Sequence, residues 1–332
     1  MPDTAPTTPL HERYLARLKQ PRWVAVLLVF AAIVTGLAGF TDSAKKLVGL
    51  FQTEHKEDPR QQLTRLEQPF TQDAFVAAAA RGDEPAVQLY LQAAMPVDEL
   101  SGQGLTALDA ATGAQRVAVV KRLLAAKADQ SRWGPRQGPA LARAATLGDE
   151  PLMRLLLDAG PAPEVVKRAY VSAAGAGQLA MLQILAPRLS GTQGQIATEA
   201  LWALAGGPIE RGAPSSARGP TATYLLAAGA DGQAVDPEVR NATVLHRATY
   251  SGERDVARVL LDQGVPVDPR DADGATPLWW VAGIGKVEMA ELLIEHRADV
   301  KVIAKDGSSA MARARYNQDD QMIALLRQHG AR

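Results

Sequence analysis

Gly274-Ala-Thr-Pro-Leu-Trp279 stands in register with two neighbouring stretches of the chain. Asn241-Ala-Thr-Val-Leu-His246 begins 33 residues before it, and Gly307-Ser-Ser-Ala-Met-Ala312 begins 33 residues after it. Fourteen residues after Leu278 comes an apolar segment, Leu292-Leu293-Ile294, and similar segments follow the other two stretches. A fixed period between about 20 and 50 residues indicates an array of stacked repeats. The C-terminal part of the chain is therefore expected to be a repeat array.

The repeat has a specific sequence signature. Asp271-Ala-Asp-Gly274-Ala-Thr276-Pro277-Leu278 resembles the first part of the ankyrin repeat, Asp-x-x-Gly-x-Thr-Pro-Leu-His-x-Ala, and Gly104-Leu-Thr106-Ala-Leu108-Asp-Ala-Ala111 is a shorter match upstream. The resemblance implies an all-α solenoid of about eight helix-turn-helix units over residues 73–332, about four fifths of the chain. Carrying the period through the chain gives eight anchor positions: Phe75, Leu108, Leu141, Tyr170, Leu201, Leu245, Leu278 and Met311.

The predicted units explain how such an array buries apolar surface. Small residues such as Ala78-Ala79 and Ala144-Ala145 lie in the first helices, which allows neighbouring units to approach closely. Leucines such as Leu123-Leu124 lie in the second helices and are expected to fill the space between units. Glycines are expected at the turns, but Lys127 and Arg297 occupy a position after the second helix where a left-handed residue is needed.

Composition and charge limit the function. The chain has 36 basic and 36 acidic residues, and this balance gives no electrostatic case for binding nucleic acid, which needs a basic surface. The absence of cysteine excludes disulfides, thiolate metal sites and cysteine nucleophiles.

The N-terminal region predicts a membrane anchor. After a polar tail over residues 1–22, the segment from Trp23 to Phe40 has eighteen residues without a charge. A helix of this length reaches about 27 Å, enough for the hydrocarbon core of a bilayer. A cleaved signal peptide, with Gly36-Leu-Ala38 as its cleavage site, and a buried core helix are the alternatives. The core alternative is the poorer one because the repeats begin about 30 residues later.

Charges beside this segment predict its orientation. Four basic residues precede it closely and two follow it, which favours a cytoplasmic N-terminus. The repeats would then face the periplasm from a bacterial inner membrane, as a single-pass protein. Residues 41–72 are expected to form a juxtamembrane helix and a linker, of which Glu54–Phe70 is a charged spacer.

Motifs for chemistry are missing from the sequence. None of the five histidines pairs with a second ligand at metal spacing, and no phosphate-binding or nucleophile motif occurs. His246 fills the histidine position of the repeat, where the resemblance implies a structural hydrogen bond between loops. An accessory enzyme domain within Gly160–Arg240 is an alternative, but that stretch has no histidine. No catalysis, cofactor, metal or small-molecule substrate is expected.

Two features point to recognition of a protein partner. An insertion between Ala205 and Thr221, residues 206–220, lengthens the fifth unit; it is either a flexible loop or part of a binding face. Ankyrin-like arrays bind proteins through hairpin tips and the exposed side of the first helices, and tyrosine, tryptophan and arginine carry much of the binding energy at interfaces. Trp279 and Trp202, at the histidine position, are expected to be packed. The candidate partner-binding residues are Arg143, Arg247, Tyr250, Trp280, Arg313 and Tyr316.

The functional prediction is a membrane-anchored repeat protein that binds a protein partner on its concave surface without catalysis. One version is a periplasmic immunity or inhibitor protein that neutralises a toxin. The other is a scaffold, which could face the cytoplasm.

Overall fold

The computed structural model describes residues 57–135, 138–189, 193–207 and 217–331, and it divides into two parts, Met1–Arg65 and Leu66–Arg332. In the first part, the described residues contain one helix, α4 (Pro59–Arg65), which lies within the predicted charged spacer. Proline suits the first turn of a helix because its missing N–H would have no partner there. The spacer therefore includes a short helix that its charge did not predict.

The predicted membrane segment, residues 23–40, lies outside the described residues, as do the polar tail and the residues that follow the segment up to 56. No helix that the structure describes is both long and apolar enough to cross a bilayer.

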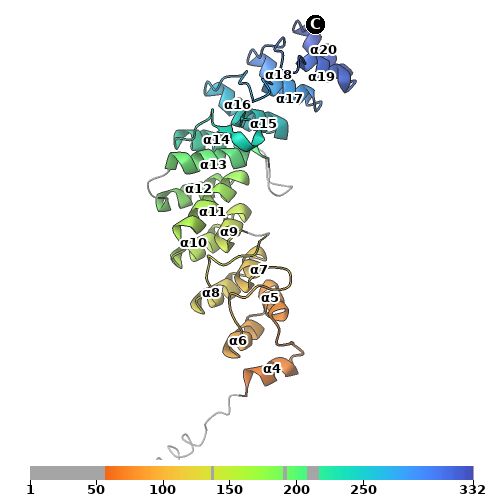
Figure 1. Ribbon diagram of the computed structural model, residues 1–332. Coiled ribbons are helices and arrows are strands. Elements are labelled where there is room, and N and C mark those ends of the chain that lie inside the picture. The colour runs from red at the N-terminus through yellow and green to blue at the C-terminus, as the bar shows by residue number, and fades with distance from the viewer. Residues whose placement is uncertain (1–56, 136–137, 190–192, 208–216, 332) are drawn as a thin grey trace, which may run out of the picture. The chain divides into compact units, whose positions relative to one another are not determined.

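In the second part, the α-helices of the described residues form eight consecutive pairs, here called repeats one to eight, and the predicted period is confirmed (Figure 1). In chain order the pairs are α5 (Gln72–Arg81) with α6 (Glu84–Gln92), α7 (Ala107–Gly113) with α8 (Val117–Ala125), α9 (Ala140–Leu147) with α10 (Glu150–Asp158), α11 (Pro163–Gly175) with α12 (Leu179–Leu185), α13 (Gln193–Ala205) with α14 (Arg218–Ala227), α15 (Val244–Ser251) with α16 (Arg254–Asp262), α17 (Pro277–Ala282) with α18 (Val287–Glu295), and α19 (Ala310–Tyr316) with α20 (Asp320–Gln328).

The core lies between neighbouring helices of the stack. All eight predicted anchors are in first helices and at most 2% exposed. The alanine pairs Ala78-Ala79 and Ala144-Ala145 are fully buried, so successive first helices pack closely against one another. In the second helices, Leu123 is fully buried. Truncating one of these leucines to alanine is expected to lower the free energy of unfolding by about 2–5 kcal/mol.

The loops between repeats carry little regular structure. Before α15, strand β1 (Val235–Asp236) pairs antiparallel with β2 (Ala242–Thr243), and the 3-10 helix η3 (Pro237–Val239) lies between them. A second 3-10 helix, η1 (Ala186–Arg188), follows α12. The β1–η3–β2 loop is the one that contributes to the groove described below.

Left-handed residues end many of the helices, as the glycine pattern predicts. Gly252, for example, has φ 87° and donates its N–H to the carbonyl groups of Ala248 and Thr249 at the end of α15. After the second helices, Lys127 and Arg297 have φ values of 63° and 69°, the conformation expected from their position in the repeat. A residue with a Cβ is strained in this conformation by roughly 1–2 kcal/mol.

Glycine at Lys127 or at Arg297 is therefore expected to raise the free energy of unfolding by about 1 kcal/mol, because glycine adopts positive φ without this strain. Urea denaturation of the two single variants measures the gain. Arg258→Gly is the control: Arg258 is exposed within α16, and glycine inside a helix is expected to lower stability by about 1 kcal/mol. If glycine at Lys127 or Arg297 lowered the free energy of unfolding, the strained positive φ assigned to these residues would be contradicted.

The fifth repeat carries the insertion at the predicted place. Helix α13 ends at Ala205 and α14 begins at Arg218, so the predicted range 206–220 is too long at its end. Arg218, Gly219 and Pro220 form the first turn of α14, in which Pro220 needs no hydrogen-bond acceptor for its nitrogen. Residues 208–216 lie outside the described part.

Candidate binding groove

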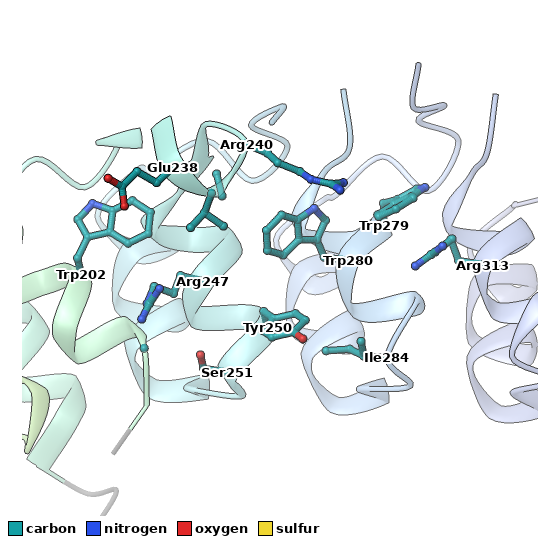
Figure 2. Close-up of a pocket in the computed structure, with 13 residues that line it drawn as sticks. Trp202, Glu238, Arg240, Arg247, Tyr250, Ser251, Trp279, Trp280, Ile284 and Arg313 are labelled. Atoms are coloured by element: carbon teal, nitrogen blue, oxygen red, sulfur yellow. The ribbon is translucent and has the colours of Figure 1, made fainter. Parts of the chain in front are cut away.

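A groove of about 710 Å³ runs across the first helices of repeats five to eight (Figure 2). Its walls come from α13, α15, α17 and α19 and from the loop that contains η3. The lining residues are Trp202, Gly206, Glu238, Val239, Arg240, Ala242, Arg247, Tyr250, Ser251, Trp279, Trp280, Ile284 and Arg313. We call this set the groove.

Trp280 lies at the centre of the groove, and its side chain is fixed by contacts with residues beneath the groove surface. Its Nε1 donates a hydrogen bond of 2.9 Å to Oδ2 of Asp271, a buried carboxylate. The other oxygen of Asp271 accepts the N–H groups of Asp273 and Ala275. The Trp280 ring meets those of His246 and Tyr250 edge to face, with centroids 5.1 and 5.8 Å away. These contacts fix the ring, so Trp280 is both a packed residue and a groove wall.

Two arginines of the groove lie over tryptophan rings of the preceding repeat. The Arg313 guanidinium carbon is 4.2 Å from the Trp279 ring centroid, and that of Arg247 is 6.0 Å from the Trp202 centroid. Such stacking over an aromatic face is attractive for a cation. It restricts both side chains to one direction, back towards the preceding repeat.

Glycines make room for the two guanidinium groups. A Cβ added at Gly206 would lie 2.7 Å from Nη2 of Arg247, and one at Gly283 would lie 2.8 Å from Nη2 of Arg313. Gly283 caps the C-terminal end of α17, and Gly206 directly follows α13. The negative end of each helix dipole therefore faces a guanidinium, which is a favourable arrangement.

Four of the six predicted partner-binding residues, Arg247, Tyr250, Trp280 and Arg313, lie in the groove. The structure places the other two outside it. Arg143 lies on α9 with its guanidinium against Gly113, the same packing that Arg247 and Arg313 make, but in repeat three. Tyr316 ends α19 and is 84% exposed, with no place among the lining residues. Position within the repeat predicted all six residues equally, whereas the folded stack brings only four of them together in the groove.

Sequence reasoning missed other lining residues. It predicted Trp202 and Trp279 to be packed, and both are partly buried, but they also form walls of the groove. Their common position in the repeat, directly after the anchor, was the available signal. Glu238, Val239 and Arg240 come from the loop with η3, and nothing in the repeat pattern marked them.

The lining carries three arginines and one carboxylate, and its apolar members are partly accessible. Tyr250 is 51%, Ile284 40% and Val239 39% exposed. Arg240 already has a partner, since its Nη1 lies 2.6 Å from Oδ2 of Asp273. The guanidinium groups of Arg247 and Arg313 donate no hydrogen bond to any residue that the structure describes and form no ion pair with one. The groove is therefore aromatic, basic and accessible.

His246 lies directly behind this wall and is fully buried. Its Nδ1 accepts from Thr243, through the backbone N–H at 3.2 Å, and its Nε2 donates to the carbonyl of Ala275 at 3.1 Å. The histidine thus joins repeat six to the loop of repeat seven, as the resemblance implies. Burial lowers the pKa of His246, although the hydrogen bond to Ala275 and the charge of Asp271 act in the opposite direction.

This lowered pKa predicts a loss of stability in acid. An unfolded histidine has a pKa of about 6.5, so the unfolded chain binds the proton first as the pH falls below that value. The stability of the wild type relative to that of His246→Gln, whose amide can still donate to Ala275, should therefore fall between pH 7.5 and 5.5. Urea denaturation at both pH values gives the comparison. An equal change of stability in the two proteins would show that His246 does not contribute to the pH dependence.

Comparison with known protein families agrees with this repeat architecture. The model for ankyrin repeats in three copies matches residues 245–332, and the model for ankyrin repeats in many copies matches residues 75–124. The first match covers three of the four repeats that build the groove.

Similar proteins include two that are named for the ankyrin repeat. An ankyrin repeat-containing protein of Treponema pallidum is 35% identical over 95 residues, 28% of this chain and 32% of its own length. The ankyrin repeat and KH domain-containing protein mask-1 of Caenorhabditis elegans is 29% identical over 260 residues, 76% of this chain and 9% of its own length. The mouse protein phosphatase 1 regulatory subunit 12A is 35% identical over 68 residues, 20% of this chain and 7% of its own length. The chain thus spans a third or less of each relative, and the family models show what it contains: ankyrin repeats, matched over residues 75–124 and 245–332.

Proposed function

We propose that this chain is a non-catalytic adaptor that holds a segment of a protein partner in the groove. The observation that carries the proposal is the groove itself: four neighbouring repeats contribute two arginines, neither in an ion pair with a described residue, and a row of partly exposed aromatic rings. Ankyrin repeats imply a role in protein–protein interaction. Aromatic and arginine side chains at the centre of a depression are the residues that most often dominate binding energy at such interfaces.

We further propose that residues 23–40 anchor the adaptor in a bacterial inner membrane, with the N-terminus in the cytoplasm and the repeats in the periplasm. The uncharged length of the segment and the basic residues before it support this arrangement. In that position the protein would act as an immunity or inhibitor protein against a toxin. A scaffold that faces the cytoplasm is the second candidate.

Fusing a reporter after Arg332 distinguishes the two arrangements. One reporter should be active only outside the cytoplasm, and the other only inside it. Activity outside supports the periplasmic inhibitor, whereas activity inside overturns the proposed orientation and leaves the scaffold. Release of the fusion from washed membranes would contradict the anchor.

Photo-crosslinking tests the groove as the docking surface. A photoreactive benzoylphenylalanine replaces Ile284, a groove residue that is 40% exposed, and in a matched control it replaces Val117, which is 43% exposed on α8. The proposal predicts one crosslinked product from position 284 in cells that make the protein natively, and none from position 117. The product should disappear when Arg247→Met and Tyr250→Ala are added. Equal products at both positions, or a product that survives these substitutions, would contradict it.

A further inference from the structure

Two guanidinium groups of the groove, those of Arg247 and Arg313, are held in place but form no ion pair with a residue that the structure describes. Arg247 and Arg313 each lie over a tryptophan of the preceding repeat and beside a glycine that leaves them room. The Nε of Arg313 is buried and has no acceptor among the described residues. A guanidinium has five N–H donors, and it matches a carboxylate in geometry and charge. Both groups are therefore prepared to bind an anionic side chain.

The stack sets the distance between these groups. Arg247 is on α15 and Arg313 is on α19, and α17 packs between these two helices. Packed helices lie about 8–10 Å apart, so two such steps separate equivalent positions by roughly 16–20 Å. Because both side chains point back by one repeat, the separation applies to the guanidinium groups as well. An extended chain advances about 3.3 Å per residue, so five or six residues span that distance.

The surface between the two arginines is apolar. Trp280, Tyr250 and Ile284 lie there, as Figure 2 shows, and the last two are 51% and 40% exposed. Covering such side chains with an apolar group of a ligand removes their surface from water, which favours binding. A segment that bridges both arginines would place its middle residues on this surface.

We propose that the groove selects an extended peptide segment with two carboxylates five or six residues apart and an apolar side chain between them. This inference rests on the proposed function and adds the chemistry of the partner. Arg240 is paired with Asp273, which leaves Arg247 and Arg313 against Glu238 among the lining residues, so a basic segment is repelled. One face of Trp202 and one of Trp279 are already covered by these two arginines. Nucleic acid is disfavoured because Glu238 lines the groove and Asp273 already neutralises Arg240, which leaves few free cations among the described lining residues for phosphate groups.

Selection from a library of random twelve-residue peptides on the immobilised full chain tests the spacing. The expected result is enrichment of peptides with Asp or Glu pairs five or six positions apart around an apolar residue. A synthetic peptide of this kind should bind at least tenfold more weakly when both glutamates become glutamines, or when they are moved to two positions apart. Arg247→Met and Arg313→Met should each weaken binding to a similar degree. Arg258→Met and Arg327→Met, which alter exposed arginines on second helices, should not.

Each other outcome identifies what fails. Enriched peptides that need the groove arginines but lack paired acids would overturn the inference and leave the proposed function intact. Enriched peptides that bind the double variant with Arg247→Met and Arg313→Met as tightly as they bind the wild type would contradict the proposed function itself. Tighter binding of a twelve-residue oligothymidylate than of any selected peptide would overturn the inference in favour of nucleic acid. No enrichment above the unselected library would overturn it as well.

Discussion

Arg218→Ala is expected to lower the free energy of unfolding by about 3–5 kcal/mol, the range for breaking a buried ion pair from one side. Arg218 is 2% exposed, and its Nε lies 2.5 Å from Oε2 of Glu253. The same guanidinium donates to the carbonyl groups of Gly175, at 2.9 Å, and of Leu204. Alanine would leave a largely buried carboxylate and two carbonyl groups without their donor, in three neighbouring repeats.

Two controls separate the ion pair from general effects. Arg258→Ala removes an exposed arginine from α16 and should change stability by less than about 0.5 kcal/mol. Glu253→Gln alone should be less harmful than Arg218→Ala, because the amide oxygen still accepts a hydrogen bond. Measuring urea denaturation of all three variants decides the matter. A change of less than about 1 kcal/mol for Arg218→Ala would mean that this ion pair does not hold repeats four to six together.

Asp109→Asn, in contrast, is expected to raise the free energy of unfolding by about 1–3 kcal/mol at pH 7.5. Asp109 is 3% exposed, and burial raises its pKa to about 6, more than the hydrogen bonds from Thr106 and the charge of Arg143 lower it. One pKa unit corresponds to about 1.4 kcal/mol. The asparagine oxygen can still accept the N–H of Thr106, so the capping box at the start of α7 remains.

The pH dependence follows from the direction of the shift. A raised pKa means that the folded state binds the proton more tightly than the unfolded state, whose aspartate has a pKa near 4. The stability from this proton is complete below about pH 4 and is lost as the pH rises through about 6. The difference between Asp109→Asn and wild type should therefore be large at pH 7.5 and small at pH 4. A constant difference across this range would contradict the raised pKa.

The sequence predicts the stack well because the repeat constrains the same physical features in every unit. The anchors from Phe75 to Met311 are buried, and Gly252 has the positive φ that a helix end requires. Even Lys127 and Arg297 follow the pattern, since the repeat imposes positive φ on residues that do not favour it. Periodicity gives these answers because each depends only on the position of a residue within its own repeat.

The groove was only partly predictable, because it depends on contacts between repeats. Register marked Arg247 and Trp280, but it marked Tyr316 equally, and only the three-dimensional stack separates them. Arg218 was not found because the insertion before it hides its register. It lies against Gly177 of the preceding repeat, as Lys286 lies against Gly252. An irregular loop can therefore conceal a packing position that recurs from repeat to repeat within one molecule.

The most direct test of the central claim is a dissociation constant. It is measured between a groove variant and the partner that was crosslinked at position 284. Arg247→Met, Tyr250→Ala and Ile284→Ser together alter only exposed groove side chains and spare Trp280, which packs on Asp271 and His246. We predict that the dissociation constant of the full-length triple variant rises at least about 30-fold, equivalent to about 2 kcal/mol, while its unfolding free energy stays within about 1 kcal/mol of wild type. An unchanged dissociation constant in a stably folded variant would contradict the assignment of the groove as the docking surface.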